Sequence, residues 1–139
     1  MLEKFFKKTE KKKENDKVLI ASLLVHAAQI DENYTGVERG IIKKAIMDLY
    51  QINITQAEEV LKNAEKKEEE SNQIIEFTKE IKKSSMEFRH KIIEILWKIV
   101  YSDRTTDMYE SNLIRRVCGL LYVSNKDSGK IRLKVQNLK

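Results

Sequence analysis

Two pairs of carboxylates with the same spacing are the residues in this chain best suited to chemistry. Asp31 and Glu38 lie seven residues apart, and so do Asp103 and Glu110. In each pair the aspartate ends an apolar helical segment, and the glutamate falls in the first turn of the next one. A tight connection would bring the two carboxylates together. Hard cations such as calcium, magnesium and manganese prefer oxygen ligands of this kind.

The spacing does not make an EF-hand. If the aspartate is position one of such a loop, position twelve is Ile42 in the first copy and Ile114 in the second. An EF-hand needs a bidentate glutamate there. The first copy has a further carboxylate directly after its aspartate. The predicted metal ligands are therefore Asp31, Glu32, Glu38, Asp103 and Glu110.

Helix capping is a second explanation for the glutamates. Thr35 and Glu38 fit the capping-box pattern, and Glu110 follows three residues after another good N-cap. The aspartates are harder to explain locally, because a negative charge at a helix C-terminus costs a few tenths to about 1 kcal/mol. Asp31 and Asp103 therefore indicate a function more strongly than the two glutamates do.

The stretches around the two pairs form an internal repeat. Residues 24–50 and 96–122 align without gaps, and both end on a tyrosine, Tyr50 and Tyr122. Each stretch predicts a helix, a short acidic loop and a second helix. A repeat of this kind indicates two helical hairpins that pack face to face.

The whole chain predicts helices and no strand pair. It has no proline and only four glycines, and its 41% apolar and 35% charged residues are typical of a globular protein with a charged surface. We expect an all-α, compact bundle of about seven helices, with residues 17–136 as one domain. The expected helices cover residues 17–31, 35–50, 55–70, 72–83, 84 to the Asp103 loop, that loop to 122, and a short segment after Ser124.

Capping residues set several of these boundaries. Asp16 is expected to cap the first core helix, and Thr55 with Glu58 to form a capping box at the third. The second helix has an apolar face made of Ile41, Ile42, Ala45, Ile46 and Leu49. In the last helix Ile131, Leu133 and Val135 are expected to point inward.

The N-terminal tail, residues 1–16, could contact a surface. Leu2, Phe5 and Phe6 share one face of a helix, and Lys7 and Lys8 follow them. This pattern predicts an amphipathic anchor on an anionic membrane or a protein partner. A disordered tail, or one that docks its phenylalanines on the domain itself, fits the same residues.

Other classes of function find little support. The chain has no glycine-rich phosphate loop, no Cys-x-x-Cys and no serine with a histidine partner, so we expect no enzyme. The net charge of +5 lies mainly in the two ends without interleaved aromatic residues, which argues against specific nucleic-acid binding. The lone Cys118 is expected to be a buried thiol. With no secretory signal and no apolar run of about 20 residues, the expected location is the cytoplasm.

Several segments, taken in order, resemble the TerB (tellurite resistance protein B) family, in particular a bacterial branch of it. They are residues 21–31 with Glu38, 95–103 with Glu110, and 112–117. The resemblance covers about residues 18–127. It implies an all-helical domain of two related halves, cytoplasmic and partly at the inner face of the membrane. It also implies a link to tellurite and chemical stress, and an acidic surface that binds divalent metal.

The resemblance assigns the family's loop aspartates to Asp31 and Asp103 and its helix glutamates to Glu38 and Glu110. The glycine that usually follows the loop aspartate is replaced, and Arg104 adds a positive charge to the second copy. The first loop is therefore the better site. The preferred hypothesis is a non-enzymatic module that binds a divalent cation (calcium, manganese or magnesium) or a basic partner. The alternative is a membrane-surface or protein–protein adaptor that uses the N-terminus.

Overall fold

A computed structural model describes the backbone of residues 2–30, 34–70, 74–103 and 108–137, and the side chains of 15–30, 34–70, 74–102 and 112–137. Over these ranges it contains seven α-helices, two short 3-10 helices and no strand, so the all-α prediction is confirmed. The elements are α1 (Leu2–Gln29), α2 (Gly36–Tyr50), α3 (Ile54–Glu70), α4 (Ile74–Thr78), η1 (Ile81–Lys83), α5 (Met86–Val100), η2 (Tyr101–Asp103), α6 (Met108–Leu120) and α7 (Asn125–Asn137).

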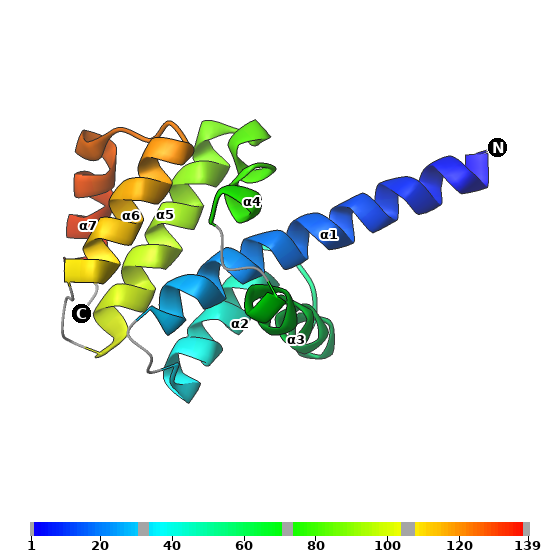
Figure 1. The fold of residues 1–139 in the computed structure, drawn as a ribbon, viewed down its shortest axis with the longest axis horizontal. Helices are drawn as coiled ribbons and strands as arrows, with labels where there is room; N and C mark the ends of the chain where they lie inside the picture. Colours follow the sequence, from blue (N-terminus) through cyan, green and yellow to red (C-terminus); the bar gives the residue numbers. More distant parts are fainter. Residues whose placement is uncertain (1, 31–33, 71–73, 104–107, 138–139) are drawn as a thin grey trace.

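The helices form two groups that meet at α5 (Figure 1). In the first group α1, α2 and α3 all contact one another, and in the second α5, α6 and α7 do the same. Both α1 and α2 pack against α5, and α4 packs against α1 and α6. The N-terminal part of α1 extends away from the bundle. None of the helices, over the residues described, is long and apolar enough to cross a membrane.

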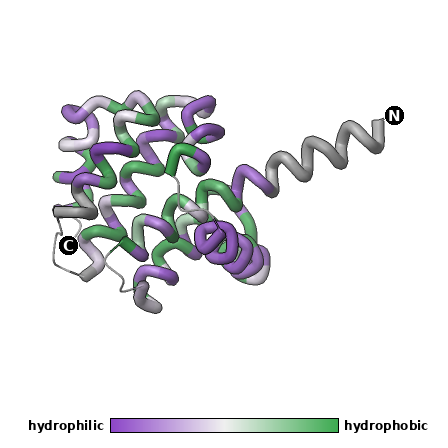
Figure 2. Tube along the Cα trace, in the orientation of Figure 1, coloured by the Kyte–Doolittle hydropathy of each residue, from purple (hydrophilic) through white to green (hydrophobic). Residues whose placement is uncertain are grey.

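The buried core consists of branched aliphatic residues and alanines with Phe77, Trp97, Tyr101 and Cys118. Burial of one valine, leucine, isoleucine or phenylalanine side chain stabilises the fold by about 1.5–3 kcal/mol relative to leaving it exposed. The largest fully buried side chains are Leu23, Leu24, Ile42, Ile46, Leu61, Phe77, Ile81, Ile92, Ile93, Leu96, Ile99 and Ile114. Figure 2 shows α3 as mostly hydrophilic, because only a narrow face of it, around Ala57, Leu61 and Ala64, is buried.

Two short-range predictions are wrong. Asp16 lies inside α1, which begins at Leu2, and does not cap a helix. The lysine- and glutamate-rich segment before it contains good helix formers and no glycine or proline, so the helix continues through it. In α7, Leu133 is 59% exposed instead of inward-facing, while Val135 is buried as expected.

Helix α4 is also shorter than predicted. The expected helix over residues 72–83 is represented by α4 and by η1, separated by a turn at Lys79 and Glu80. The break lets Ile74, Phe77 and Ile81 all reach the core. Ser85 and Ser124 cap α5 and α7, since their hydroxyl groups accept hydrogen bonds from the backbone N–H of Phe88 and Asp127.

Candidate functional site

Residues 31–33, which we call the acidic stretch, are followed in the sequence by a capping box at the start of α2. Thr35 Oγ1 accepts a hydrogen bond from the Glu38 backbone N–H (3.1 Å) and donates one to Glu38 Oε1 (3.0 Å). The Thr35 backbone N–H donates to the same oxygen at 3.1 Å. Only 3% of Glu38 is exposed. The predicted capping role of Glu38 is confirmed, and the cap fixes a buried carboxylate next to the acidic stretch.

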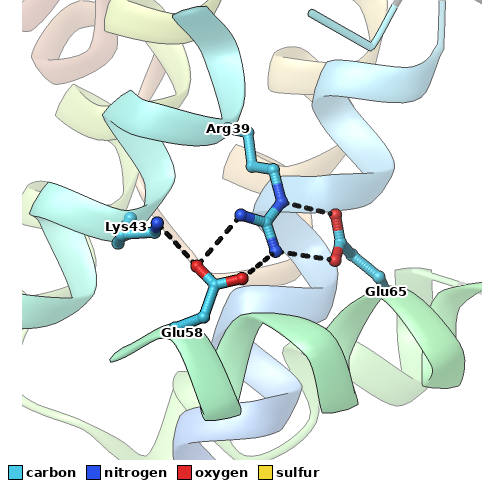
Figure 3. Close-up of polar contacts among 4 residues, drawn as sticks. All are labelled: Arg39, Lys43, Glu58 and Glu65. Atoms are coloured by element: carbon cyan, nitrogen blue, oxygen red, sulfur yellow. Dashed lines mark hydrogen bonds and ion pairs between the residues drawn. The ribbon is translucent and has the colours of Figure 1, made fainter. Parts of the chain in front are cut away.

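Arg39, the next residue, joins α2 to α3 through two carboxylates (Figure 3). Its guanidinium donates to both oxygens of Glu58, at 3.0 and 2.7 Å, and to both oxygens of Glu65, at 3.1 and 3.2 Å. Lys43, one turn further along α2, lies 2.6 Å from Glu58 Oε2. Paired hydrogen bonds between a guanidinium and a carboxylate fix distance and angle together. This network therefore sets the position of α3 against α2.

Glu58 pairs with Arg39 and Lys43 and does not form the capping box that the sequence predicts for it. Helix α3 is capped by Asn53, whose side-chain oxygen accepts from the Gln56 backbone N–H at 2.8 Å. The capping is reciprocal, because the side-chain oxygen of Gln56 accepts a hydrogen bond from the Asn53 backbone N–H at 3.0 Å. The Thr55 and Glu58 capping box is wrong. Asn53 starts the helix two residues earlier, which leaves Glu58 to pair with Arg39 and Lys43.

The charges in the network reinforce one another. The hydrogen bond to Arg39, followed by the one to Lys43, lowers the pKa of Glu58 from its ordinary value of 4.5 to about 2. The hydrogen bonds to Glu58 and Glu65 raise the pKa of Arg39 above its already high value. At neutral pH the carboxylate and the guanidinium are therefore both charged.

Tyr34 borders this cluster on the side of the acidic stretch. Its hydroxyl oxygen is buried and makes no hydrogen bond of good geometry within the described residues. Burial raises the pKa of Tyr34, and the nearby Glu65 carboxylate raises it further. The hydroxyl stays protonated at all ordinary pH values.

A second polar pair involves Glu68, about one turn further along α3 than Glu65. His26 Nδ1 is 3.2 Å from Glu68 Oε1, and the ring of His26 lies 6.4 Å from that of Phe77. The pair links α1 to α3 in a half-buried position. No local sequence pattern pairs His26 with Glu68, which is 42 residues away.

Most of the predicted site residues lie outside the residues whose side chains are described. Asp31 and Glu32 lie between α1 and α2, and the side chains of Asp103 and Glu110 lie outside as well. The same is true of the side chains of Leu2, Phe5, Phe6, Lys7 and Lys8, whose backbone is part of α1. Their proximity and their role stay predictions. Among the described residues, no three His, Cys, Asp or Glu side chains are grouped so as to hold a metal ion.

Sequence reasoning missed the ion-pair roles of Arg39, Lys43, Glu58 and Glu65. A signal for them exists. Arg39 and Lys43 are one helical turn apart, and Glu58 and Glu65 are two turns apart on the next helix. Two oppositely charged stripes on neighbouring helices predict a salt-bridge network between them. Cys118 is buried as expected, and burial raises the pKa of its thiol.

The lowered pKa of Glu58 predicts a pH dependence of stability. A carboxylate with a lower pKa in the folded state stabilises fully above its unfolded-state value of 4.5. That contribution is lost as the pH falls through the folded value of about 2. We therefore expect the free energy of unfolding to fall between these two pH values, and to fall less in Glu58→Gln.

The measurement is urea unfolding followed by circular dichroism at a series of pH values. Glu59→Gln is the matched control, because Glu59 is exposed on the same helix and makes no ion pair among the described residues. An identical pH profile for wild type and Glu58→Gln would show that the network does not hold Glu58 in solution.

Comparison with protein families gives one match that covers most of the chain. Residues 17–133 match the model of a family described as tellurite resistance protein TerB. No curated protein matches the chain. No solved structure matches it either. The matched segment begins inside α1 and ends inside α7, so it includes both helical groups and the whole network around Arg39.

Proposed function

Because this chain belongs to the TerB family, we propose that it is a non-enzymatic helical module that binds a divalent cation at the acidic stretch before α2. The observation that carries the proposal is Glu38. Its carboxylate is buried and is held in one position by Thr35, seven residues after Asp31. A fixed carboxylate is already placed to bind and loses little side-chain entropy on binding a cation.

The neighbouring charges restrict where the cation would bind. Glu58 and Glu65 already pair with Arg39, so they are poor ligands for a second positive charge. Asp31, Glu32 and Glu38 are the proposed ligands in the first copy. Asp103 and Glu110 are the proposed ligands in the second, where Arg104 weakens binding by like-charge repulsion. Calcium, manganese and magnesium are the proposed cations, and a basic segment of a protein partner could occupy the same carboxylates.

Titration calorimetry tests the proposal. Wild type is expected to bind at least one of the three cations saturably, and Asp31→Asn to bind it about tenfold more weakly or worse, since one charged ligand is lost. Glu38→Gln separates the two roles of Glu38. Glutamine keeps the acceptor oxygen that the capping box uses but removes the charge. It should therefore weaken binding while leaving thermal stability nearly unchanged.

The matched control is Glu69→Gln, an exposed acidic residue on α3. It should bind as wild type does. If wild type, Asp31→Asn and Glu38→Gln all give the same weak heats with all three cations, the chain does not bind a divalent cation here. The further proposal of a role in tellurite or chemical-stress resistance needs a separate test, in which loss of the protein should lower survival on tellurite.

One observation favours the second candidate function, contact with an anionic membrane surface from the cytoplasm. The helix α1 continues without a break to Leu2, so its first residues can display an amphipathic face beyond the bundle (Figure 1). Binding to vesicles that contain phosphatidylserine is expected at low salt, and to be lost in Phe5→Ser/Phe6→Ser. Wild-type protein that stays in the supernatant at low salt would exclude this function.

A further inference from the structure

Only part of the apolar face of helix α2 is fully buried in the bundle. Ile42 and Ile46 are completely buried, but the other three apolar residues of the predicted face are only half-buried. These three line a hollow of about 560 Å³ between α2 and α5. The apolar residues of this hollow are Ile41, Ala45 and Leu49 from α2, and Phe88 and Ile95 from α5.

The hollow continues at one end into a second one. A further space of about 560 Å³ shares Leu49 and Phe88 with the first and reaches Ile20 of α1 and Ile81 of η1. We call the two together the α2–α5 groove. On α2 its apolar residues recur every four positions, from Ile41 to Leu49, so the groove follows more than two turns of the helix. A long apolar groove between two helices is the shape that accepts an amphipathic helix.

The charges along the first hollow are mainly positive. Its rim carries Lys44, Lys91 and Lys98 against Asp48 and Glu94. Glu94 is engaged by Lys134 of α7, 3.1 Å away. In contrast, neither Lys44 nor Lys98 makes an ion pair within the described part of the chain, and the pair formed by Lys91 with Glu87 is long, at 4.0 Å. The second hollow adds Lys17 against Asp16 and Glu80, and Glu80 pairs with Lys83 at 3.5 Å. Among the described residues, the excess of unpaired positive charge therefore lies along the first hollow, at Lys44 and Lys98.

We propose that the α2–α5 groove binds an amphipathic helix of a partner protein whose apolar stripe is flanked by acidic residues. The apolar stripe would cover Ile41, Ala45 and Leu49, and the acidic residues would pair with Lys44 and Lys98. A second copy of this chain fits less well, because its net charge is +5 and its N-terminal amphipathic segment is rich in lysine. A bilayer fits less well than a helix, since the apolar floor lies at the bottom of a groove.

The inference is independent of the cation site before α2 and uses different residues. The test is a titration of ¹⁵N-labelled full chain with a synthetic amphipathic helix. The probe carries leucines at i, i+3, i+4 and i+7 and glutamates on both flanks. Saturable amide shifts confined to α2, α5 and the adjoining part of α1 are expected. A control peptide with lysines in place of the glutamates should bind at least about tenfold more weakly.

Two kinds of variant locate the binding. Lys44→Glu/Lys98→Glu should raise the Kd for the acidic peptide about tenfold or more. The control Lys66→Glu/Lys130→Glu makes the same change in charge at exposed positions on α3 and α7. It should leave the Kd within about twofold of the wild-type value. Ala45→Trp fills the groove without changing charge and should also weaken binding. Circular dichroism establishes that each variant folds.

Results of three kinds would overturn the proposal. The first is no saturable shift at about 1 mM peptide, or equal binding of the acidic and basic peptides. The second is a concentration-dependent dimer in sedimentation that Ala45→Trp dissociates, since the groove would then hold a second copy. The third is binding to phosphatidylserine vesicles that Lys44→Glu/Lys98→Glu abolishes, since the lysines would then face lipid.

Discussion

Replacement of Phe77 by alanine is expected to lower the free energy of unfolding by about 3–5 kcal/mol, the typical cost of removing a buried aromatic ring. Phe77 is fully buried in α4, a helix of only five residues. A helix this short is not stable by itself, so its position depends on its packing. Loss of the ring removes the contact with His26 and leaves a cavity between α4 and the neighbouring helices.

Urea unfolding followed by circular dichroism measures the effect. Ile75→Ala is the matched control, because Ile75 is 61% exposed on the same short helix and should change stability by no more than about 0.5 kcal/mol. Phe77→Leu, which keeps part of the volume, should fall between the two. Equal stabilities for Phe77→Ala and Ile75→Ala would mean that α4 does not pack as described.

The second large effect is expected at a buried contact between α1 and α3. Ser22 Oγ of α1 lies 2.6 Å from the carbonyl oxygen of Val18 and 3.4 Å from that of Ala64 in α3. Ala64 is fully buried. A larger side chain at this position must push the helices apart, so Ala64→Leu should destabilise the protein by about 1–3 kcal/mol although leucine is more hydrophobic.

The neighbouring position separates overpacking from any general effect of leucine. Asn63 is exposed on the same helix, and Asn63→Leu should change stability by about 0.5 kcal/mol or less. Because Ala64 lies next to Glu65, the displaced α3 should also weaken the ion pair of Glu65 with Arg39. An Ala64→Leu variant as stable as wild type would contradict the close α1–α3 contact.

A local signal predicted the cap of α2 correctly. The capping box of Thr35 and Glu38 was predicted because both partners lie within one helical turn. The cap of α3 was not. Asn53 and Thr55 are both good N-caps, each followed three residues later by a suitable partner. The structure uses Asn53, and Glu58 pairs with Arg39 of another helix, a contact that the local pattern around Thr55 does not contain.

In the candidate site, too, contacts between residues that are distant in the sequence were not predicted. The pairing of His26 with Glu68 joins residues 42 positions apart, and a single sequence gives no measure of such distances. Asp16 has the local character of an N-cap, yet the helical propensity of the preceding lysines and glutamates outweighs it, and α1 runs through. The roles of Asp31, Glu32, Asp103 and Glu110 rest on the repeat and on the family. They stay predictions, because those side chains lie outside the described residues.

The most direct measurement of the cation site is paramagnetic broadening of the amide signals by Mn²⁺, added at substoichiometric amounts to ¹⁵N-labelled protein. If the cation binds before α2, the amides of residues 31–38 broaden first, and Asp31→Asn restores their signals while Glu69→Gln does not. Broadening that begins on the exposed carboxylates of α3, or that Asp31→Asn leaves unchanged, would contradict a cation site before α2.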